Sequence, residues 1–495
     1  MSGKKTVLVN SFYYTFSSFL VKAFGFFLLP LYTVYLTPGD YGITNLIHSF
    51  LSVATFLVSF SLYAAIPRFY VEYKEDQEKV KSLFGSIIIF TFIIGLVFFG
   101  VSLFLSKVIV RFLFTGIPFY PYVLIALITL LFQSLHTIHE NILKAIQKGK
   151  FLASLSVIVF LLQTGITIVF VVVLKLGPVG VLLSQAIISF IYSIFMVFDL
   201  RKRNLLSFSF NWKILKRALS YSIPIIPHNL STSVASFVSK IFINNSASLA
   251  SVGLYGIAMQ FGSLIDLFQT SVNKAFTPWF FNVLYEGKGK SDIDQMEFVK
   301  ILLSLYSVIY LGIGLFSQEV ILLMTHSRYA LAWKVVPILV VAFSVKSIYY
   351  FYVNILFYHQ EAARKIFYAS LSGSFLDISL AAILIPRFGM YGAALSFLIA
   401  KICIVVIVVI LCRQYNQGMF DLLVMLRTIM PSILLIGLGL IFSYTKYQSM
   451  FHWGNFLYKM GISVFYILFL ILQNRAQIRR LLNYYRKRVI VFELQ

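Results

Sequence analysis

LGPVGVLLS at residues 176–184 returns as FGMYGAALS at residues 388–396, with glycine on glycine and serine on serine. Upstream of these strings, FLASLS at residues 151–156 returns as FYASLS at residues 367–372. A repeat with a period of about 210 residues predicts two similar structural units in one chain. In an apolar chain such units are helical bundles, and secondary transporters commonly place their substrate path between two of them.

Two shorter matches precede these and keep the same order in both halves. YGI at residues 41–43 pairs with VGL at 252–254, and AIP at 65–67 pairs with AFTP at 275–278. Any one match can arise by chance, whereas four in the same order indicate a true internal repeat.

The composition is that of a membrane protein. Hydrophobic residues make up 60% of the 495 residues and charged residues only 12%, whereas soluble domains carry about 25% charged residues. We count about 14 apolar segments of about 20 residues, a length that spans a bilayer as a helix, including one that begins near residue 218. Barrel strands would be about ten residues long with alternating polarity, and that pattern is absent. The predicted fold class is therefore an all-α polytopic membrane protein.

The repeat sets the predicted domain boundaries. Residues 1–206 form an N-terminal six-helix lobe, residues 207–415 form a second six-helix lobe, and residues 416–495 form an accessory helix pair with a basic tail. The cytoplasmic loop at 201–217 separates the two lobes. The last pair of helices has no counterpart in the repeat.

Charge predicts the orientation. The net charge is +24, and most of the Lys and Arg residues fall in loops on the same side as the N-terminus. Cytoplasmic loops carry this excess, so both termini are predicted to be cytoplasmic. The basic segments 201–217 and 475–488 then lie beside anionic membrane lipids, and nucleic acid is not an expected partner.

No resident cofactor or metal is expected. Cys403 and Cys412 lie nine residues apart in one predicted helix, too far apart to form a disulfide. GKGKS at residues 287–291 lacks the first glycine of a phosphate-binding loop. Active transport would then need a coupling ion, H⁺ or Na⁺, or the membrane potential.

Four motifs carry a family resemblance. They are LTPGDYGI at residues 36–43, AAIPRFY at 64–70, VGLY at 252–255 and NKAFTPW at 273–279. Together they resemble the polysaccharide transporter (O-antigen-type flippase) family of the multidrug/oligosaccharidyl-lipid/polysaccharide exporter superfamily. The resemblance covers about residues 8 to 412 and implies two six-helix lobes around a central cavity.

The resemblance also implies a function. Members translocate undecaprenyl-diphosphate-linked oligosaccharides, such as O-antigen, capsule or exopolysaccharide repeat units, across the inner membrane by alternating access. It implies a polysaccharide polymerase and a chain-length regulator as partners. The alternatives are a cation-coupled exporter of drugs or small molecules, a lipid II flippase, or a polymerase or ligase. The last is an enzyme class that would need a larger outer loop than the segment at about 106–119.

Charged groups within spans are costly and therefore mark functional sites or partners. Lysines outnumber acids there, which suits a substrate that carries phosphate. The predicted cavity residues are Lys22, Lys240 and Asp266, with Lys274 and Arg68 near the cytoplasmic mouth.

Several of these charged groups have a structural alternative. Asp377 and Lys401 are predicted to form an intramembrane pair, structural or coupling, which Lys346 joins. Lys274 and Lys459 lie near span ends, where a lysine can extend its ammonium to the interface. His48, His136 and His139 are either proton carriers or hydrogen-bonded structural histidines.

Overall fold

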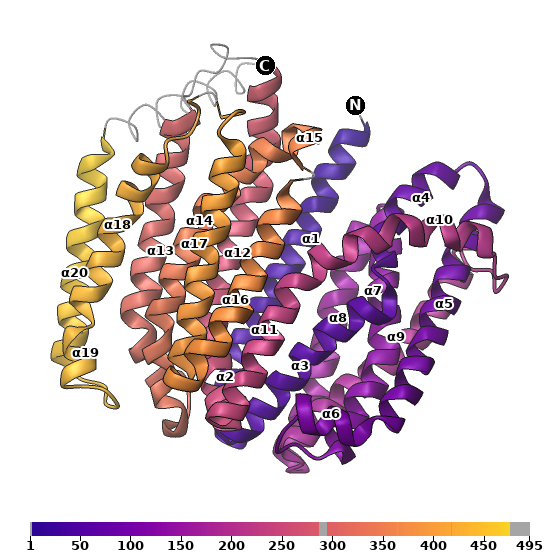
Figure 1. Cartoon of the computed structure of the whole chain (residues 1–495), viewed down its shortest axis with the longest axis horizontal. Helices are drawn as coiled ribbons and strands as arrows, with labels where there is room; N and C mark the ends of the chain where they lie inside the picture. Colours follow the sequence, from indigo (N-terminus) through magenta and orange to yellow (C-terminus); the bar gives the residue numbers. More distant parts are fainter. Residues whose placement is uncertain (1, 287–294, 364, 417, 476–495) are drawn as a thin grey trace. The chain divides into compact units, whose positions relative to one another are not determined.

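The computed structural model describes residues 2–286, 295–363, 365–416 and 418–475 (Figure 1), and in this part of the chain the regular structure is helical, with no strand. The chain divides into two compact units. Unit 1 comprises Met1–Gly256 and Ser374–Ala393, and unit 2 comprises Ile257–Gly373 and Ala394–Gln495. The predicted all-helical fold class is confirmed. The basic tail after residue 475 lies outside the described residues.

Unit 1 holds the first eleven α-helices and the short helical segments between them. In chain order these are α1 (Ser2–Phe27), α2 (Leu29–Tyr35), α3 (Pro38–Ser59), η1 (Leu62–Ala64), α4 (Ala65–Tyr73), α5 (Gln77–Phe104), α6 (Ser106–Leu113), η2 (Phe119–Val123), α7 (Leu124–Ala145), α8 (Gly149–Ile168), η3 (Val169–Val173), α9 (Gly177–Lys202), α10 (Trp212–Ser222), η4 (Ile223–Ile225) and α11 (Ile226–Ser246).

Three helices are divided between the two units, and the remaining helices after α11 belong to unit 2. The shared helices are α12 (Leu249–Glu286), α16 (Ile366–Phe388) and α17 (Met390–Cys412). Unit 2 also contains α13 (Gln295–Met324), η5 (Ser327–Val335), α14 (Val336–Tyr358), α15 (Gln360–Ala363), α18 (Leu422–Gly439), α19 (Ile441–Thr445) and α20 (Trp453–Gln473).

Thirteen helical segments of the described residues are long and apolar enough to cross a membrane, and each matches one of the predicted spans. The remaining predicted span, near residue 218, corresponds to α10 and α11, which are not among the thirteen. The reason is the polarity of α11, which carries Lys240, Asn244 and several serines within its 21 residues. The chain is thus a multi-pass membrane protein in which one segment is more polar than the rest.

The repeated glycines have matching local structure. Gly177 and Gly389, which pair in the repeat, both have φ of +56°, a left-handed conformation that glycine adopts without steric cost. Gly42 and Gly253, a second repeat pair, face each other where α3 meets the start of α12. A Cβ on Gly42 would lie 3.2 Å from the nitrogen of Gly253, and one on Gly253 would lie 3.1 Å from the nitrogen of Gly42. Only glycine permits this approach of the two backbones.

The boundary between the compact units differs from the predicted lobe boundary at residue 206. Helix α10 packs on α4 and α5, and α11 packs on α3, so both helices belong with unit 1. The two pseudo-symmetric six-helix lobes stay a prediction.

An apolar core in unit 1 positions α4 and α10. Phe69 of α4 and Leu215 of α10 are buried in it together with residues of α5, α7 and α9. Helix α10 buries Ile214, Leu215 and Ala218 on one face, the spacing of an amphipathic helix. Its charged residues therefore point away from the core, and α10 lies across the end of the bundle beside α4 (Figure 1).

Candidate functional site

In unit 1, Lys240 of α11, a predicted cavity residue, is held by α3. Lys240 Nζ donates to Ser49 Oγ at 2.6 Å and lies 3.4 Å from the carbonyl oxygen of Asn45. None of the ion pairs among the described residues includes Lys240. Its charge is therefore solvated by neutral oxygens, and no carboxylate in the described part of the chain balances it.

Such a charge is expensive inside a membrane protein. Taking an ammonium out of water costs roughly several kcal/mol unless a counter-charge and further hydrogen bonds compensate for the lost hydration. Lys240 is half-buried, and its charge has no carboxylate partner among the described residues. This is the property expected of a site for an anionic substrate group.

Unit 2 contains an intramembrane lysine, Lys346, whose charge is paired with a carboxylate. Lys346 Nζ on α14 lies 2.6 Å from Asp266 Oδ1 on α12, and the same oxygen accepts a hydrogen bond of 2.9 Å from the Tyr350 hydroxyl. The Lys346 ammonium also lies 5.6 Å from the centre of the Phe343 ring. The charge of this lysine is balanced within the protein.

Polar contacts continue between α12 and α14 beyond the ion pair. Asn354 Nδ2 donates to Asn273 Oδ1 at 2.8 Å, and Thr277 Oγ1 donates to Asn354 Oδ1 at 3.1 Å. Hydrogen bonds of this kind hold helices together where neither surface is wholly apolar. The Asp266–Lys346 pair thus belongs to a longer polar contact between the two helices.

The remaining predicted intramembrane residues lie on α1, α12, α16 and α17. Lys22 on α1 and Lys274 on α12 have exposed side chains. Asp377 is buried in unit 1, whereas Lys401, which lies in unit 2, has its ammonium 4.6 Å from the centre of the Phe397 ring. The predicted Asp377–Lys401 pair stays a prediction. Lys346 was expected to join that pair, and its ion pair is instead with Asp266.

Lys459 corrects a sequence expectation. It was a candidate for an interfacial lysine near a span end, yet its side chain is fully buried between α20 and α13. Its ammonium lies 2.7 Å and 3.0 Å from the two carboxylate oxygens of Glu319 and 3.1 Å from Gln318 Oε1. This pair attaches the C-terminal helix pair to the body of unit 2.

Two of the histidines have structural partners. His139 is fully buried, with Nδ1 2.9 Å from the Tyr192 hydroxyl and Nε2 3.2 Å from Asp199 Oδ2, which Arg203 also contacts at 2.8 Å. His136 stacks on Tyr192. Both ring nitrogens of His139 are occupied, which favours its structural interpretation. Among the described residues, no group of His, Cys, Asp and Glu is arranged to hold a metal.

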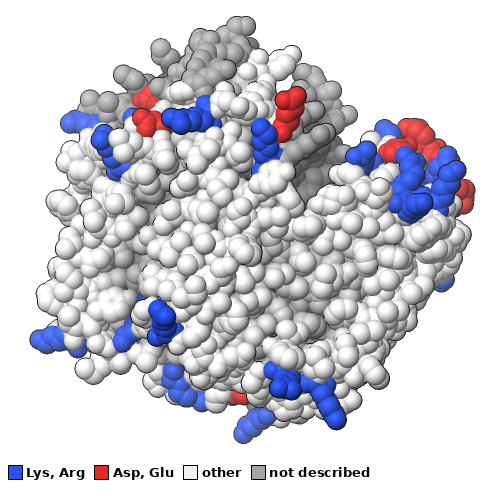
Figure 2. All heavy atoms as spheres, viewed as in Figure 1, with Lys and Arg blue, Asp and Glu red and all other residues white. Residues whose placement is uncertain are grey.

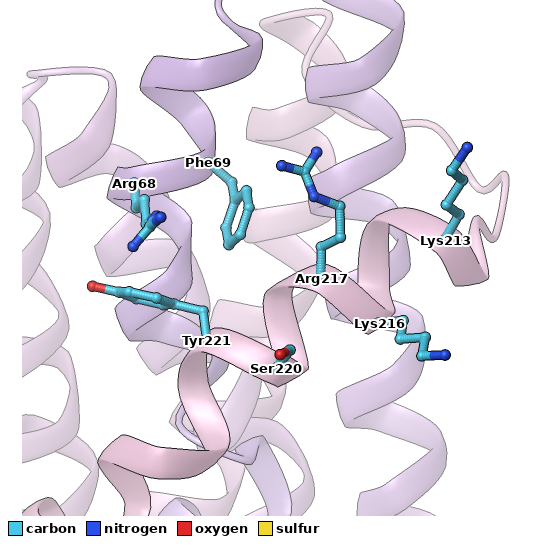
Figure 3. A pocket seen from close by; sticks show the side chains of 7 residues that line it. All are labelled: Arg68, Phe69, Lys213, Lys216, Arg217, Ser220 and Tyr221. Atoms are coloured by element: carbon cyan, nitrogen blue, oxygen red, sulfur yellow. The ribbon is translucent and has the colours of Figure 1, made fainter.

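A basic pocket of about 570 Å³ lies between α4 and α10 of unit 1 (Figure 3). Its cations are Arg68 of α4 and Lys213, Lys216 and Arg217 of α10. Two spans separate the N-terminus from α4, and four more separate α4 from α10. The pocket is therefore on the N-terminal side of the membrane, the predicted cytoplasmic side. On the face shown in Figure 2, the charged side chains of unit 1 gather at the ends of its helices and leave the middle uncharged.

Aromatic side chains orient the two arginines. The Arg68 guanidinium lies 4.6 Å from the centre of the Tyr221 ring, and Arg217 lies 5.6 Å from the centre of the Phe69 ring. Arg217 also donates to Glu72 at 2.8 Å. In Figure 3 the two lysines lie at the far end of the pocket from Arg68.

The sequence reasoning named Arg68 but treated the α10 cations only as an orientation signal. Positions 213, 216 and 217 share one helical face, and apolar residues 214, 215 and 218 share the other. This 3.6-residue pattern was the signal that could have identified a basic helix lying on the membrane surface.

The fold is that of a multi-pass transporter. It matches the lipid II flippase MurJ in an inward closed conformation with a TM-score of 0.71 and 19% identity, over 95% of this chain and 100% of that chain. It matches an inward-facing multidrug resistance transporter of the MATE family and MOP superfamily with a TM-score of 0.62 and 14% identity, over 79% and 94%. The MATE transporter VcmN of Vibrio cholerae gives 0.51 and 15%, over 84% and 98%.

The family follows from the sequence. A family model described as polysaccharide biosynthesis protein matches residues 7–284, more than half of the chain. The chain therefore belongs to the polysaccharide biosynthesis protein family, and its resemblance to the polysaccharide transporters is confirmed. Comparison with curated proteins gives no match.

Proposed function

We propose that this protein is a flippase that moves polyprenyl-diphosphate-linked oligosaccharides across the cytoplasmic (inner) membrane by alternating access. The lipid-linked unit would be an O-antigen, capsule or exopolysaccharide repeat unit, and both termini would be cytoplasmic. Membership of the polysaccharide biosynthesis family and the transporter fold support this proposal.

One observation carries the choice of an anionic substrate. Lys240 brings a positive charge beside the membrane span α3, and none of its contacts with the described residues is a carboxylate. A diphosphate would supply the missing counter-charge during transport, and lysine holds phosphate as a mobile point charge that can release it again. An exporter of cationic drugs would instead need an unpaired carboxylate.

The substrate divides into three parts with different needs. The polyprenyl tail remains in the hydrocarbon region, because removing it would cost about 0.8 kcal/mol per CH₂. The sugar needs a polar path, and the diphosphate needs cations along that path. A coupling ion, H⁺ or Na⁺, or the membrane potential would drive the cycle. A polymerase and a chain-length regulator would receive the product at the outer face.

The test uses a strain that lacks this protein and carries wild type, Lys240→Met or Lys150→Gln. Lys150 is an exposed cation at the start of α8 and serves as the matched control. We expect wild type and Lys150→Gln to restore surface glycan. Lys240→Met, expressed at the same level, should leave the lipid-linked unit in the cytoplasmic leaflet.

Two outcomes would contradict the proposal. If the deletion leaves surface glycan intact and changes drug sensitivity, the protein is a small-molecule exporter and not a flippase. If Lys240→Met transports as well as wild type, the intramembrane ammonium does not bind the substrate.

A further inference from the structure

The basic pocket between α4 and α10 has features that the positive-inside bias does not explain. That bias requires cations on one side of the membrane, without any particular arrangement. Here four cations line one pocket, with the two lysines at the far end from Arg68, and Glu72 is the only carboxylate paired with any of them among the described residues. The pocket therefore carries a net positive charge that a ligand can balance.

The arginines of the pocket are already oriented. Arg68 lies against Tyr221, and Arg217 is fixed by Glu72 at 2.8 Å and by the Tyr73 hydroxyl at 2.6 Å. A guanidinium can bind phosphate oxygens in a bidentate manner, and the prior orientation of Arg68 lowers the entropy lost on binding. Arg217, whose charge is paired with Glu72, helps to shape the pocket. Lys213 and Lys216 are exposed, so they are available to a second phosphate.

The position of the pocket favours a ligand that is itself in the membrane. Phe208, Phe210 and Trp212, which precede or begin α10, have exposed side chains. Exposed aromatic rings beside a basic amphipathic helix are typical of the membrane–water interface. A ligand in this pocket can keep its tail in the bilayer and its head between the cations.

The geometry points to a docking site for the diphosphate of a prenyl lipid, used before the lipid-linked substrate enters the membrane-spanning path. This inference rests on the proposed function and adds a first binding site, outside the spans, to the intramembrane Lys240. A diphosphate is preferred over the single phosphodiester of a phospholipid because three cations of the pocket, Arg68, Lys213 and Lys216, have no carboxylate partner among the described residues, more than one phosphate needs.

The binding test uses the purified full chain with farnesyl diphosphate as a short-chain probe. All titrations are made in a Lys240→Met background, so that the intramembrane ammonium does not contribute. We expect saturable binding that Arg68→Gln/Lys216→Gln weakens about tenfold or more, since a hydrogen bond to a charged group is worth about one factor of ten or more. Lys150→Gln should bind as the background does.

Two comparisons keep the inference testable. Short-chain phosphatidylglycerol should bind at least about tenfold more weakly than farnesyl diphosphate, and binding should weaken as salt rises, because the pocket is open to solvent. If the double variant fails to fold, Lys216→Gln alone, at an exposed position, should still weaken binding. Equal affinity for phosphatidylglycerol, or undiminished binding by the folded variants, would overturn the inference.

The two proposals fail in different ways. If wild type restores surface glycan in the cell, and the pocket substitutions change neither probe binding in the Lys240→Met background nor surface glycan in the wild-type background, only the docking site is wrong. If wild type moves no lipid-linked glycan, the flippase function itself is wrong, whatever the pocket binds.

Discussion

Lys240 of unit 1 and Lys346 of unit 2 are both half-buried lysines within helical bundles, and they differ in what balances their charge. Lys346 has Asp266 at 2.6 Å, whereas Lys240 has a serine hydroxyl at 2.6 Å and a backbone carbonyl at 3.4 Å. A balanced pair serves packing between helices, whereas an unbalanced cation keeps its affinity for an outside anion. This difference is the reason we propose a structural role for Lys346 and substrate binding for Lys240.

The largest expected effect follows from removing the carboxylate in unit 2. Asp266→Asn leaves Lys346 charged and without its partner, and should destabilise the protein by about 2–3 kcal/mol, below the figure for a fully buried pair because both side chains are partly exposed. Unfolding in mixed detergent micelles measures this loss. A stability equal to that of wild type would show that the pair contributes nothing.

Removing both charges should recover most of the loss. In Asp266→Leu/Lys346→Met no charge is left unpaired, so the stability should return to within about 1 kcal/mol of wild type. The same unfolding measurement applies, with Asp266→Asn as the reference. If the double variant is as unstable as the single one, the loss comes from the Tyr350 hydrogen bond or from packing, not from the orphaned lysine.

The sequence predicted the helical fold and the repeat because these depend on local patterns. Apolar length identifies a span, and Gly177 and Gly389 mark the same left-handed turn in both halves. The partners of intramembrane charges could not be predicted, because they lie far away in sequence. Glu319 binds Lys459 from 140 residues away, and Asp266 binds Lys346 from 80.

The basic pocket shows a second limit. Arg68 was identified from its motif, but its neighbours on α10 become a pocket only when the apolar face of α10 packs beside α4. The sequence predicts the side of the membrane on which these cations lie, but only the packing of α10 beside α4 brings them to one pocket.

Removing the unbalanced lysine should have a smaller effect on stability. Lys240→Met deletes a charge whose burial is unfavourable and loses one hydrogen bond to Ser49, so the two changes oppose each other. The free energy of unfolding should remain within about 1 kcal/mol of wild type, while glycan transport is lost. A large loss of stability together with the loss of transport would make Lys240 a structural residue like Lys346.

The smallest effect on stability is expected from giving Lys240 the partner that it lacks. Ser49→Asp places a carboxylate where a hydroxyl already contacts the ammonium. Because the gain from the new ion pair is offset by the burial of a second charge, stability should change by less than about 1 kcal/mol. Transport should nevertheless fall sharply, since the ammonium would be neutralised as Lys346 is, and Ser49→Asn, which is uncharged and similar in size, should retain more of it. If Ser49→Asp transports as well as Ser49→Asn, the substrate does not need the free charge of Lys240, and the distinction between the two lysines has no bearing on function.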